Sequence, residues 1–198
     1  MDPLGGSASA SLVSTLQQEL EHCISFHTDK IITNASAAGM EKDSENPRHK
    51  FNKELLAEIG DSRMATIRMN KAFVGSRLIF SPNVHGWLKE EDAVKVGGKV
   101  IDSGLGDCDL CAAAAVCAIR RCARLSALKV EAFGTGGHAF IVINRGNSAS
   151  DDNLSTWGAD CLIVDVWSHN QGISNTAVMT VSEYNALFGG HLSASRLM

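Results

Sequence analysis

Apolar residues near the N-terminus recur at intervals of three and four positions, the spacing that lines one face of a helix. They are Leu12, Leu16, Leu20, Cys23 and Ile24. This pattern predicts an amphipathic helix that begins at about Ser11. Residues 1–10 are mostly Gly, Ser and Ala, with one Pro. Such a composition has little surface to bury, so it predicts a flexible tail.

A second helix is predicted within residues 104–125, GLGDCDLCAAAAVCAIRRCARL. Small and apolar residues fill nearly every position from Ala112 to Ile119, which is typical of a helix buried on all sides. Asp107 is a favoured N-cap residue and places Cys108 in the first helical turn. The preceding residues 90–104, EEDAVKVGGKVIDSG, are charged and contain paired glycines, so we expect a charged turn with a short strand or helix end.

Period-two alternation of apolar residues follows in ALKVEAFGTGGHAFIVINRG, which divides at its glycines into two predicted strands. The alternating positions are Val130, Ala132, Ala139, Ile141 and Ile143. After the polar residues 147–156, a third β-rich segment spans 157–172, WGADCLIVDVWSHNQG. Upstream, residues 35–50 are expected to form a loop and residues 52–59 a short helix.

This order of elements predicts an α+β fold in which one helix packs against an antiparallel β-sheet, with additional N-terminal helices. The chain has 198 residues, 44% of them hydrophobic and 20% charged, which is ordinary for a globular protein. We therefore expect a single domain over residues 11–198. The sequence carries no signal for the oligomeric state.

Charge and hydropathy narrow the range of partners. The formal net charge of −4 offers no basic field for a phosphate backbone, so we expect no nucleic acid partner. The longest apolar run, LCAAAAVCAI, is the size of a buried helix segment and predicts no membrane span. The N-terminus MDPLGGSASASL lacks the basic start and apolar core of a Sec-type signal peptide.

Four of the six cysteines share the second predicted helix, where they cannot all reach disulfide partners. They are Cys108, Cys111, Cys117 and Cys122. We therefore expect reduced thiols, as in a cytosolic setting. Cys117 and Cys122 are interpreted as packing residues. A structural zinc site would need a second cysteine pair, and no metal or other cofactor is expected.

Cys108 and Cys111 form a CxxC, which leaves a dithiol oxidoreductase as one alternative. Enzymes that resemble thioredoxin place a cis-proline after the dithiol, whereas all three prolines of this chain precede it. The other interpretation is that one of these cysteines is a catalytic nucleophile. Cys108 is the candidate, because free N–H groups and the helix dipole at a helix N-terminus stabilise a thiolate and can bind an oxyanion.

A cysteine nucleophile needs a base and a group that orients the base. His138 is the candidate base because it starts a predicted strand after GTGG, and His85 and His169 are reserves. Asp165 is the candidate acid, since it interrupts the apolar LIVDVW and needs a partner there; Asp160 stays open as an alternative. Asn83 or Trp87 are weighed as a further oxyanion donor, and Trp157 and Trp167 are expected to pack over the triad.

Three motifs in this order, GDCxxxAAAAxxxIRR, GGHAFIVI and LIVDVW, resemble the core of the transglutaminase-like superfamily within the papain-like cysteine hydrolases. The resemblance covers about residues 100–170 and places Cys108, His138 and Asp165 at the positions of the catalytic triad. It implies a papain-like core and attack of a thiolate on an amide carbonyl, with a thioester intermediate. Water as the acceptor gives a glutamine deamidase or a protease, and an amine gives a transglutaminase-type acyltransferase.

The family also contains bacterial effector enzymes that act on host proteins. The short chain, its Ser/Ala-rich N-terminus and its expected reduced cysteines are similar to such effectors. The resemblance thus implies a host protein as substrate and secretion into the host cell cytosol, with a cytoplasmic location as the alternative. From another functional class, a non-enzymatic binding module with a degenerate hydrolase core stays open.

Overall fold

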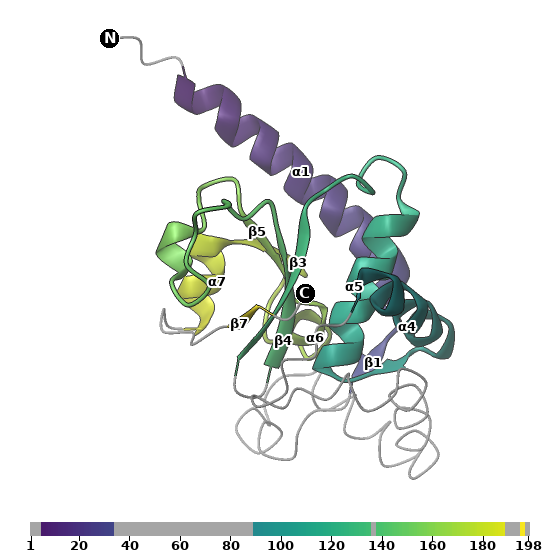
Figure 1. Ribbon diagram of the computed structural model, residues 1–198. Helices are drawn as coiled ribbons and strands as arrows, with labels where there is room; N and C mark the ends of the chain where they lie inside the picture. The colour runs from purple at the N-terminus through teal and green to yellow at the C-terminus, as the bar shows by residue number, and fades with distance from the viewer. Residues whose placement is uncertain (1–4, 34–88, 136–137, 189–194, 197–198) are drawn as a thin grey trace.

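The computed structural model describes residues 5–33, 89–135, 138–188 and 195–196. Within these residues the protein has an α+β fold, in which helices pack against a five-stranded antiparallel sheet (Figure 1). The α+β prediction is therefore confirmed. The loop expected at residues 35–50 and the helix expected at residues 52–59 lie outside the described residues.

The main sheet has the strand order β6-β5-β4-β3-β7, and each neighbouring pair is antiparallel. Its strands are β3 (Val130–Thr135), β4 (His138–Ile143), β5 (Leu162–Val164), β6 (Val178–Thr180) and β7 (Ser195–Arg196). A separate parallel pair joins β1 (Ile32–Thr33) to β2 (Leu105–Gly106).

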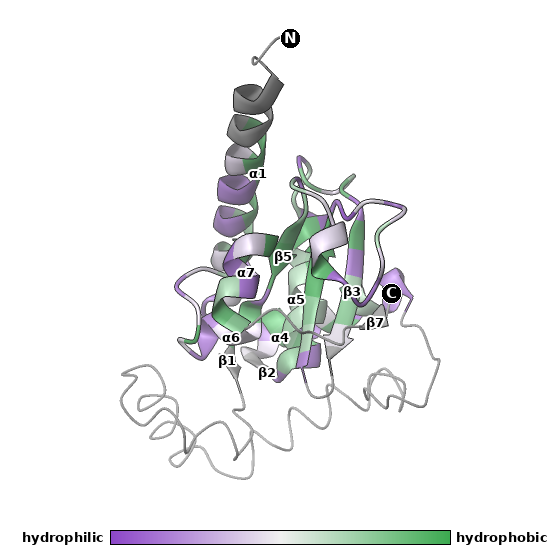
Figure 2. Ribbon diagram, turned by 90° about the vertical axis from the view of Figure 1, so that its left-hand side faces the viewer, coloured by the Kyte–Doolittle hydropathy of each residue, from purple (hydrophilic) through white to green (hydrophobic). Residues whose placement is uncertain are grey.

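The two faces of the sheet bury two different apolar cores. Of the five residues of the period-two pattern, four are buried in the core that also contains residues of the helices α1, α4 and α5, and Ala132 is partly buried and packs against it. The residues between them, including Phe133 and Phe140, join the second core with Trp157 and Tyr184. Strand β5, which consists of Leu, Ile and Val, is accordingly drawn in the green of hydrophobic residues in Figure 2. The predicted alternation is confirmed.

Helix α5 (Cys108–Arg121) is buried on all sides, and every residue from Asp109 to Ile119 is buried. It packs against strand β4 and against helices α1 and α4. The side chain of Asp107 accepts a hydrogen bond from the amide of Leu110 at 3.2 Å, which is N-cap geometry. The predicted start of this helix and its complete burial are both confirmed.

Helix α4 (Glu90–Ser103) occupies the segment expected to be a charged turn, so that expectation was wrong. The paired glycines suggested a break, but here they permit close packing. A Cβ atom on Gly97 would lie 2.1 Å from the carbonyl oxygen of Ala113 in α5. The chain does turn at Gly104, whose φ of 65° is left-handed and ends the helix.

Helix α1 (Gly5–Thr28) contains the predicted amphipathic helix but begins at Gly5 rather than at about Ser11. Residues 5–10, expected in a flexible tail, are therefore helical, and this end extends beyond the rest of the molecule in Figure 1. Adding turns to an existing helix is far less costly than starting one, so the packed part of α1 supports its free end.

Side chains of α1 also bind the outer strand of the sheet. The Glu21 carboxylate accepts hydrogen bonds from the amides of Ala177 and Val178, at 3.1 Å and 2.8 Å. The amide group of Gln17 donates to the Val178 carbonyl oxygen at 3.0 Å. These bonds satisfy backbone groups that an edge strand would otherwise leave unpaired.

Two short helices follow the strands, α6 (Val166–Asn170) after β5 and α7 (Val181–Phe188) after β6, and a 3₁₀ turn spans Leu154–Thr156.

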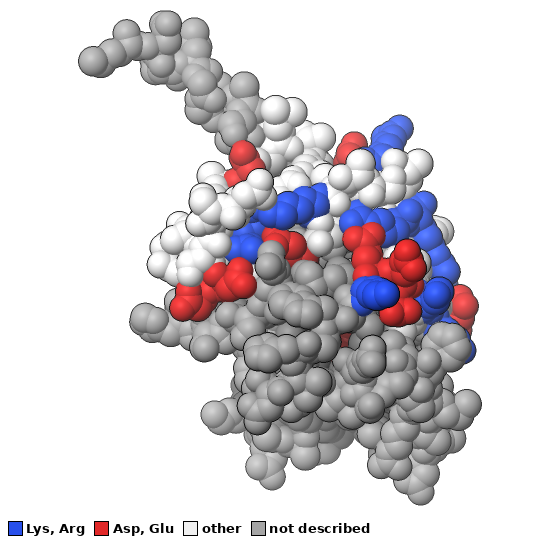
Figure 3. Space-filling view, in the orientation of Figure 1, with Lys and Arg blue, Asp and Glu red and all other residues white. Residues whose placement is uncertain are grey.

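Lysine and arginine side chains lie next to acidic ones over much of the described surface that Figure 3 shows. One such pair joins Arg120 of α5 to Glu90 of α4, and the hydrogen bonds from the Arg120 guanidinium lower the pKa of the Glu90 carboxyl. Of the helices in the described ranges, none combines the length and apolar character that a membrane crossing requires.

We predict that Gly97→Ala lowers the free energy of unfolding by about 1–3 kcal/mol or more, because the new methyl group overlaps the backbone of α5. Gly98→Ala is the matched control. Its Cβ meets the end of the flexible Arg121 side chain at 3.1 Å and the Cys117 sulfur at an ordinary contact distance of 3.9 Å, so the gain in helix propensity should stabilise the protein by about 0.5–1 kcal/mol. Urea unfolding of both variants measures the difference, and equal midpoints would contradict the close packing of α4 on α5.

Candidate catalytic site

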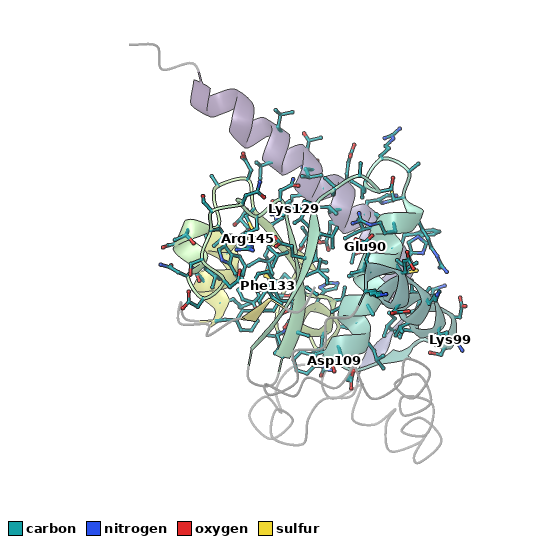
Figure 4. All side chains as sticks on the ribbon, viewed as in Figure 1. Glu90, Lys99, Asp109, Lys129, Phe133 and Arg145 are labelled. Carbon is teal, nitrogen blue, oxygen red and sulfur yellow. The ribbon has the colours of Figure 1, made fainter. Side chains whose placement is uncertain are left out.

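The three residues of the predicted triad each lie at the end of an element. Cys108 begins α5, His138 begins β4, and Asp165 follows β5 and caps the N-terminus of α6. Asp165 is thus not embedded in a strand, as its apolar flanks suggested, but ends one. Figure 4 labels Asp109, the neighbour of Cys108, at the end of α5 that is remote from α1.

His138 and Asp165 are joined directly. The Nε2 atom of His138 lies 2.7 Å from Oδ2 of Asp165, whose side chain is fully buried, while 19% of the His138 side chain is exposed. A carboxylate only accepts hydrogen bonds, so Nε2 of His138 carries a proton and donates it to Asp165. In the neutral histidine tautomer that has its proton on Nε2, the Nδ1 atom has the free electron pair of a base.

Two further hydrogen bonds hold the Asp165 carboxylate. Its Oδ1 atom accepts from the amide of Ser168 at 3.0 Å, and its Oδ2 atom accepts from the Ser168 hydroxyl at 2.7 Å. Ser168 is itself fully buried. The carboxylate is therefore oriented by the first turn of α6 before it meets the imidazole.

The pairing of β4 with β5 explains why His138 and Asp165 meet. The antiparallel ladder pairs Ile141 with Val164, which directly precedes Asp165. Continuing this register leads to His138 and Trp167, and their ring centroids are indeed 5.1 Å apart. Trp167 thus packs on the imidazole as expected and limits its movement.

Cys108 lies beside the same strand. Its thiol donates to Oδ1 of Asp109 at 3.2 Å, and the backbone amide of Ala139, the residue after His138, is a hydrogen-bond partner of its sulfur. The structure therefore joins His138 to Asp165 and places Cys108 against the backbone next to His138.

The expected stabilisation of a Cys108 thiolate is not what the structure favours. Burial raises the pKa of Cys108 well above its usual value, and the neighbouring carboxylates of Asp109 and Asp107 raise it further. The Ala139 amide lowers this pKa, but to a smaller extent. At neutral pH, Cys108 is therefore a protonated thiol.

The remaining cysteines are not placed for chemistry at this site. Cys111 is completely buried, and burial raises its pKa well above the usual value. Cys117 is also buried, in agreement with its interpretation as a packing residue. All six cysteines are free thiols. Within the described ranges, no group of three or more His, Cys, Asp or Glu residues could hold a metal ion.

The structure also places the other candidates. Asp160 is exposed in the turn before β5, and Asp165, not Asp160, binds His138. Trp157 does not pack over the triad as expected; it lies in the second core, with its ring centroid 4.8 Å from that of Phe133. The reserve His169 lies in α6, facing the carbonyl oxygen of Ser174. The reserve His85 and the oxyanion candidates Asn83 and Trp87 lie outside the described residues.

Sequence analysis missed two residues that act on this site, Ser168 and Asp109. Ser168 stands three residues after Asp165, the spacing by which an N-cap residue and the third helical residue bond to each other. That signal was present in the sequence but was hidden by the strand interpretation. Asp109 was visible as the neighbour of Cys108, but only the structure shows that its carboxylate accepts from the thiol.

No protein family model matches this sequence, and no curated protein matches it by sequence either. The class established here is thus that of the fold, an α+β protein with an antiparallel sheet and a central buried helix.

We predict that Asp109→Asn speeds alkylation of Cys108 by iodoacetamide at neutral pH by roughly tenfold, the factor that one pKa unit gives. The substitution removes a negative charge that disfavours the thiolate, so the pKa of Cys108 falls and its thiolate fraction rises. Rates are followed by mass spectrometry of the Cys108 peptide from pH 6 to 9, about the range in which alkylation by a thiolate is measured.

Asp107→Asn is the control for this experiment, because it removes the same charge from the same helix end and asparagine is also a good N-cap residue. Asp107 raises the pKa of Cys108 less than Asp109 does, so the acceleration should be smaller. An alkylation rate that is unchanged in Asp109→Asn would contradict the thiol–carboxylate contact.

We predict that Ser168→Ala lowers the free energy of unfolding by about 1.5–3 kcal/mol, because it removes a buried hydrogen bond to a charged group. Ser174→Ala is the matched control, since the Ser174 hydroxyl donates to a neutral carbonyl oxygen of Thr176 at 2.7 Å. Its loss should cost only about 0.5–1.5 kcal/mol. Denaturant unfolding compares the two, and a Ser168 variant no less stable than the control would refute the stronger bond.

Proposed function

We propose that this protein is a thiol-dependent amide hydrolase with a papain-like, transglutaminase-like core, in which Cys108, His138 and Asp165 form the catalytic triad. The observation that carries the proposal is the 2.7 Å contact between His138 and the buried carboxylate of Asp165. The buried acid orients the imidazole of His138, and the backbone amide of the next residue bonds the sulfur of Cys108. This arrangement is suited to nucleophilic catalysis.

In the first step, Nδ1 of His138 takes the proton of the Cys108 thiol, and the sulfur attacks the carbonyl carbon of an amide. The Asp165 carboxylate stabilises the resulting imidazolium through Nε2. The carbonyl oxygen becomes an oxyanion, which the backbone N–H groups at the N-terminus of α5 are suited to bind. The carbon–nitrogen bond then breaks, and the imidazolium gives its proton to the leaving amine or ammonia.

This leaves the acyl group as a thioester on Cys108. In the second step His138 removes a proton from a water molecule, whose oxygen attacks the thioester carbon. The carbon–sulfur bond breaks, the sulfur regains a proton from the imidazolium, and the product leaves as a carboxylic acid. No cofactor takes part in this sequence of steps.

The high pKa of Cys108 decides in which form the enzyme rests. Burial and Asp109 keep the sulfur protonated, so the nucleophile rests as a neutral thiol. The thiol must leave Asp109 and turn toward Nδ1 before it reacts. His138 therefore acts as a general base during attack, rather than as the cation of a preformed ion pair.

We propose a protein as the substrate, with its glutamine side chains or its backbone amides as the reacting groups. The chemistry above is the same for both, and an amine in place of water would give acyl transfer instead. The short chain, its Ser/Ala-rich N-terminus and its reduced cysteines are similar to those of effector enzymes in this family, which supports a host protein as the substrate, reached after secretion into the host cell cytosol.

One observation favours a second candidate function, a binding module that keeps the hydrolase core without its chemistry. The Cys108 thiol donates to Asp109, which holds it in its unreactive form. On this alternative Asp109 is a permanent partner of the thiol, and the His138–Asp165 pair serves stability alone.

The test is incubation of the full chain with a host cell lysate, followed by mass spectrometry for new peptide termini and for glutamine converted to glutamate. Ammonia release measures the second reaction independently. We predict that Cys108→Ala removes all modification and that His138→Ala lowers the rate by about 10²–10⁴-fold, the usual contribution of a general base. Asp165→Asn, which keeps the shape of the side chain, should also be strongly impaired.

Cys111→Ala is the control, because Cys111 is buried in the core and takes no part in the proposed steps. It should retain activity, whereas a dithiol oxidoreductase would lose it. New peptide termini or deamidated glutamines that persist in Cys108→Ala would contradict the proposal. A lysate with no modified protein, together with a stable complex that survives in Cys108→Ala, would support the binding module.

A further inference from the structure

Two cysteines that are far apart in the sequence meet at the other end of α5. Cys23 lies on α1, and Cys122 is the C-cap residue of α5. The Cys23 thiol donates to the carbonyl oxygen of Ala118 at 3.4 Å, and the backbone amide of Cys122 donates to the same oxygen at 3.2 Å. The two thiols are themselves hydrogen-bonded to each other.

The two thiols differ in their access to solvent. Cys23 is 8% exposed and belongs to the main core, whereas Cys122 is half-buried at its edge. Burial, with a smaller contribution from Cys122, raises the pKa of Cys23 to about 12. An oxidant from solution therefore reaches Cys122 first, and Cys23 is the neighbouring thiol that can respond.

We infer that Cys23 and Cys122 form a redox-sensitive site that a peroxide converts to a disulfide between α1 and α5. In the first step, hydrogen peroxide oxidises the Cys122 sulfur to a sulfenic acid and releases one water molecule. In the second, the Cys23 sulfur attacks the Cys122 sulfur, the S–O bond breaks, and a second water molecule leaves. Two thiols lose two hydrogens and two electrons in total, and one peroxide is reduced to two waters.

The crosslink would fasten α1 to the helix that carries the candidate catalytic site. It would join residues 23 and 122 into a covalent loop of about half the chain. A longer loop lowers the conformational entropy of the unfolded state more, and so stabilises the folded state more. The site at Cys108 lies about 20 Å away along α5, from the rise of 1.5 Å per residue. The disulfide should therefore stabilise the fold without altering the alkylation of Cys108.

This inference is independent of the proposed function, since it concerns the opposite end of α5. The test uses the full chain, reduced and desalted, then treated with a small excess of hydrogen peroxide at mildly alkaline pH. Free thiols are blocked with N-ethylmaleimide, and peptides are mapped by mass spectrometry without reduction. We expect a Cys23–Cys122 peptide pair in most of the protein, a melting temperature raised by several degrees, and reversal of both by a reductant.

Matched variants separate the pair from the other thiols. Cys23→Ala and Cys122→Ala should each abolish the crosslink and the thermal shift. Cys117→Ala should keep both, because the Cys117 sulfur faces Gly98 of α4 on another side of α5. The inference is overturned if Cys122 ends as a sulfinic acid, or in a disulfide between two chains, while Cys23 is still alkylated after unfolding. The oxidation states of Cys122 and Cys23 are measured on the unsubstituted protein, so this result does not depend on whether the variants fold.

Discussion

The burial of α5 on all sides is the constraint on which the rest of the structure depends. One helix with eleven successive buried residues needs partners around its whole circumference, and the sheet supplies only one side. Helices α1 and α4 supply the others, and α4 comes so close that a glycine is required at the contact with Ala113. The run of alanines in α5 serves the same purpose, because small side chains allow neighbouring backbones to approach. The fold is therefore organised by close backbone packing around one helix rather than by large side chains.

The candidate site follows from where this buried helix begins. Its first residue, Cys108, is partly buried and lies at the end of the sheet where β4 begins and β5 ends. The antiparallel register of these two strands brings His138 and Asp165 together, and the short helix α6 holds the carboxylate with two bonds from Ser168. Every polar group of the site is thus positioned by the end of an element whose interior is apolar. Rigid surroundings of this kind hold a catalytic geometry without strain in the backbone of the site itself.

Much of this arrangement could be predicted from the sequence, because local patterns carry it. The alternation from Val130 to Ile143 identified the two strands β3 and β4, and Asp107 identified the start of α5. The failures have a physical cause in common, since they depend on contacts between elements. Gly97 and Gly98 read as a break in the chain, yet they mark a helix–helix contact that only α5 explains. Asp165 was correctly singled out as a buried acid, but its role as a helix cap required Ser168 to be seen beside it.

Two opposing effects act on the pKa of Cys108: the helix N-terminus favours the thiolate, and burial favours the thiol. The N-terminus of a helix stabilises a nearby negative charge by about 0.3–1 kcal/mol, rising to about 2 kcal/mol in favourable partly buried sites. Removing a charge from water shifts its pKa by up to about 3–5 units in a fully buried site, roughly 4–7 kcal/mol, and by less at Cys108, which is partly buried. Desolvation is therefore the larger effect, and Asp109 acts in the same direction. Burial and Asp109 therefore keep the thiol protonated. Under the proposed mechanism it needs a base that takes this proton at the moment of attack, which is the role proposed for His138 oriented by Asp165.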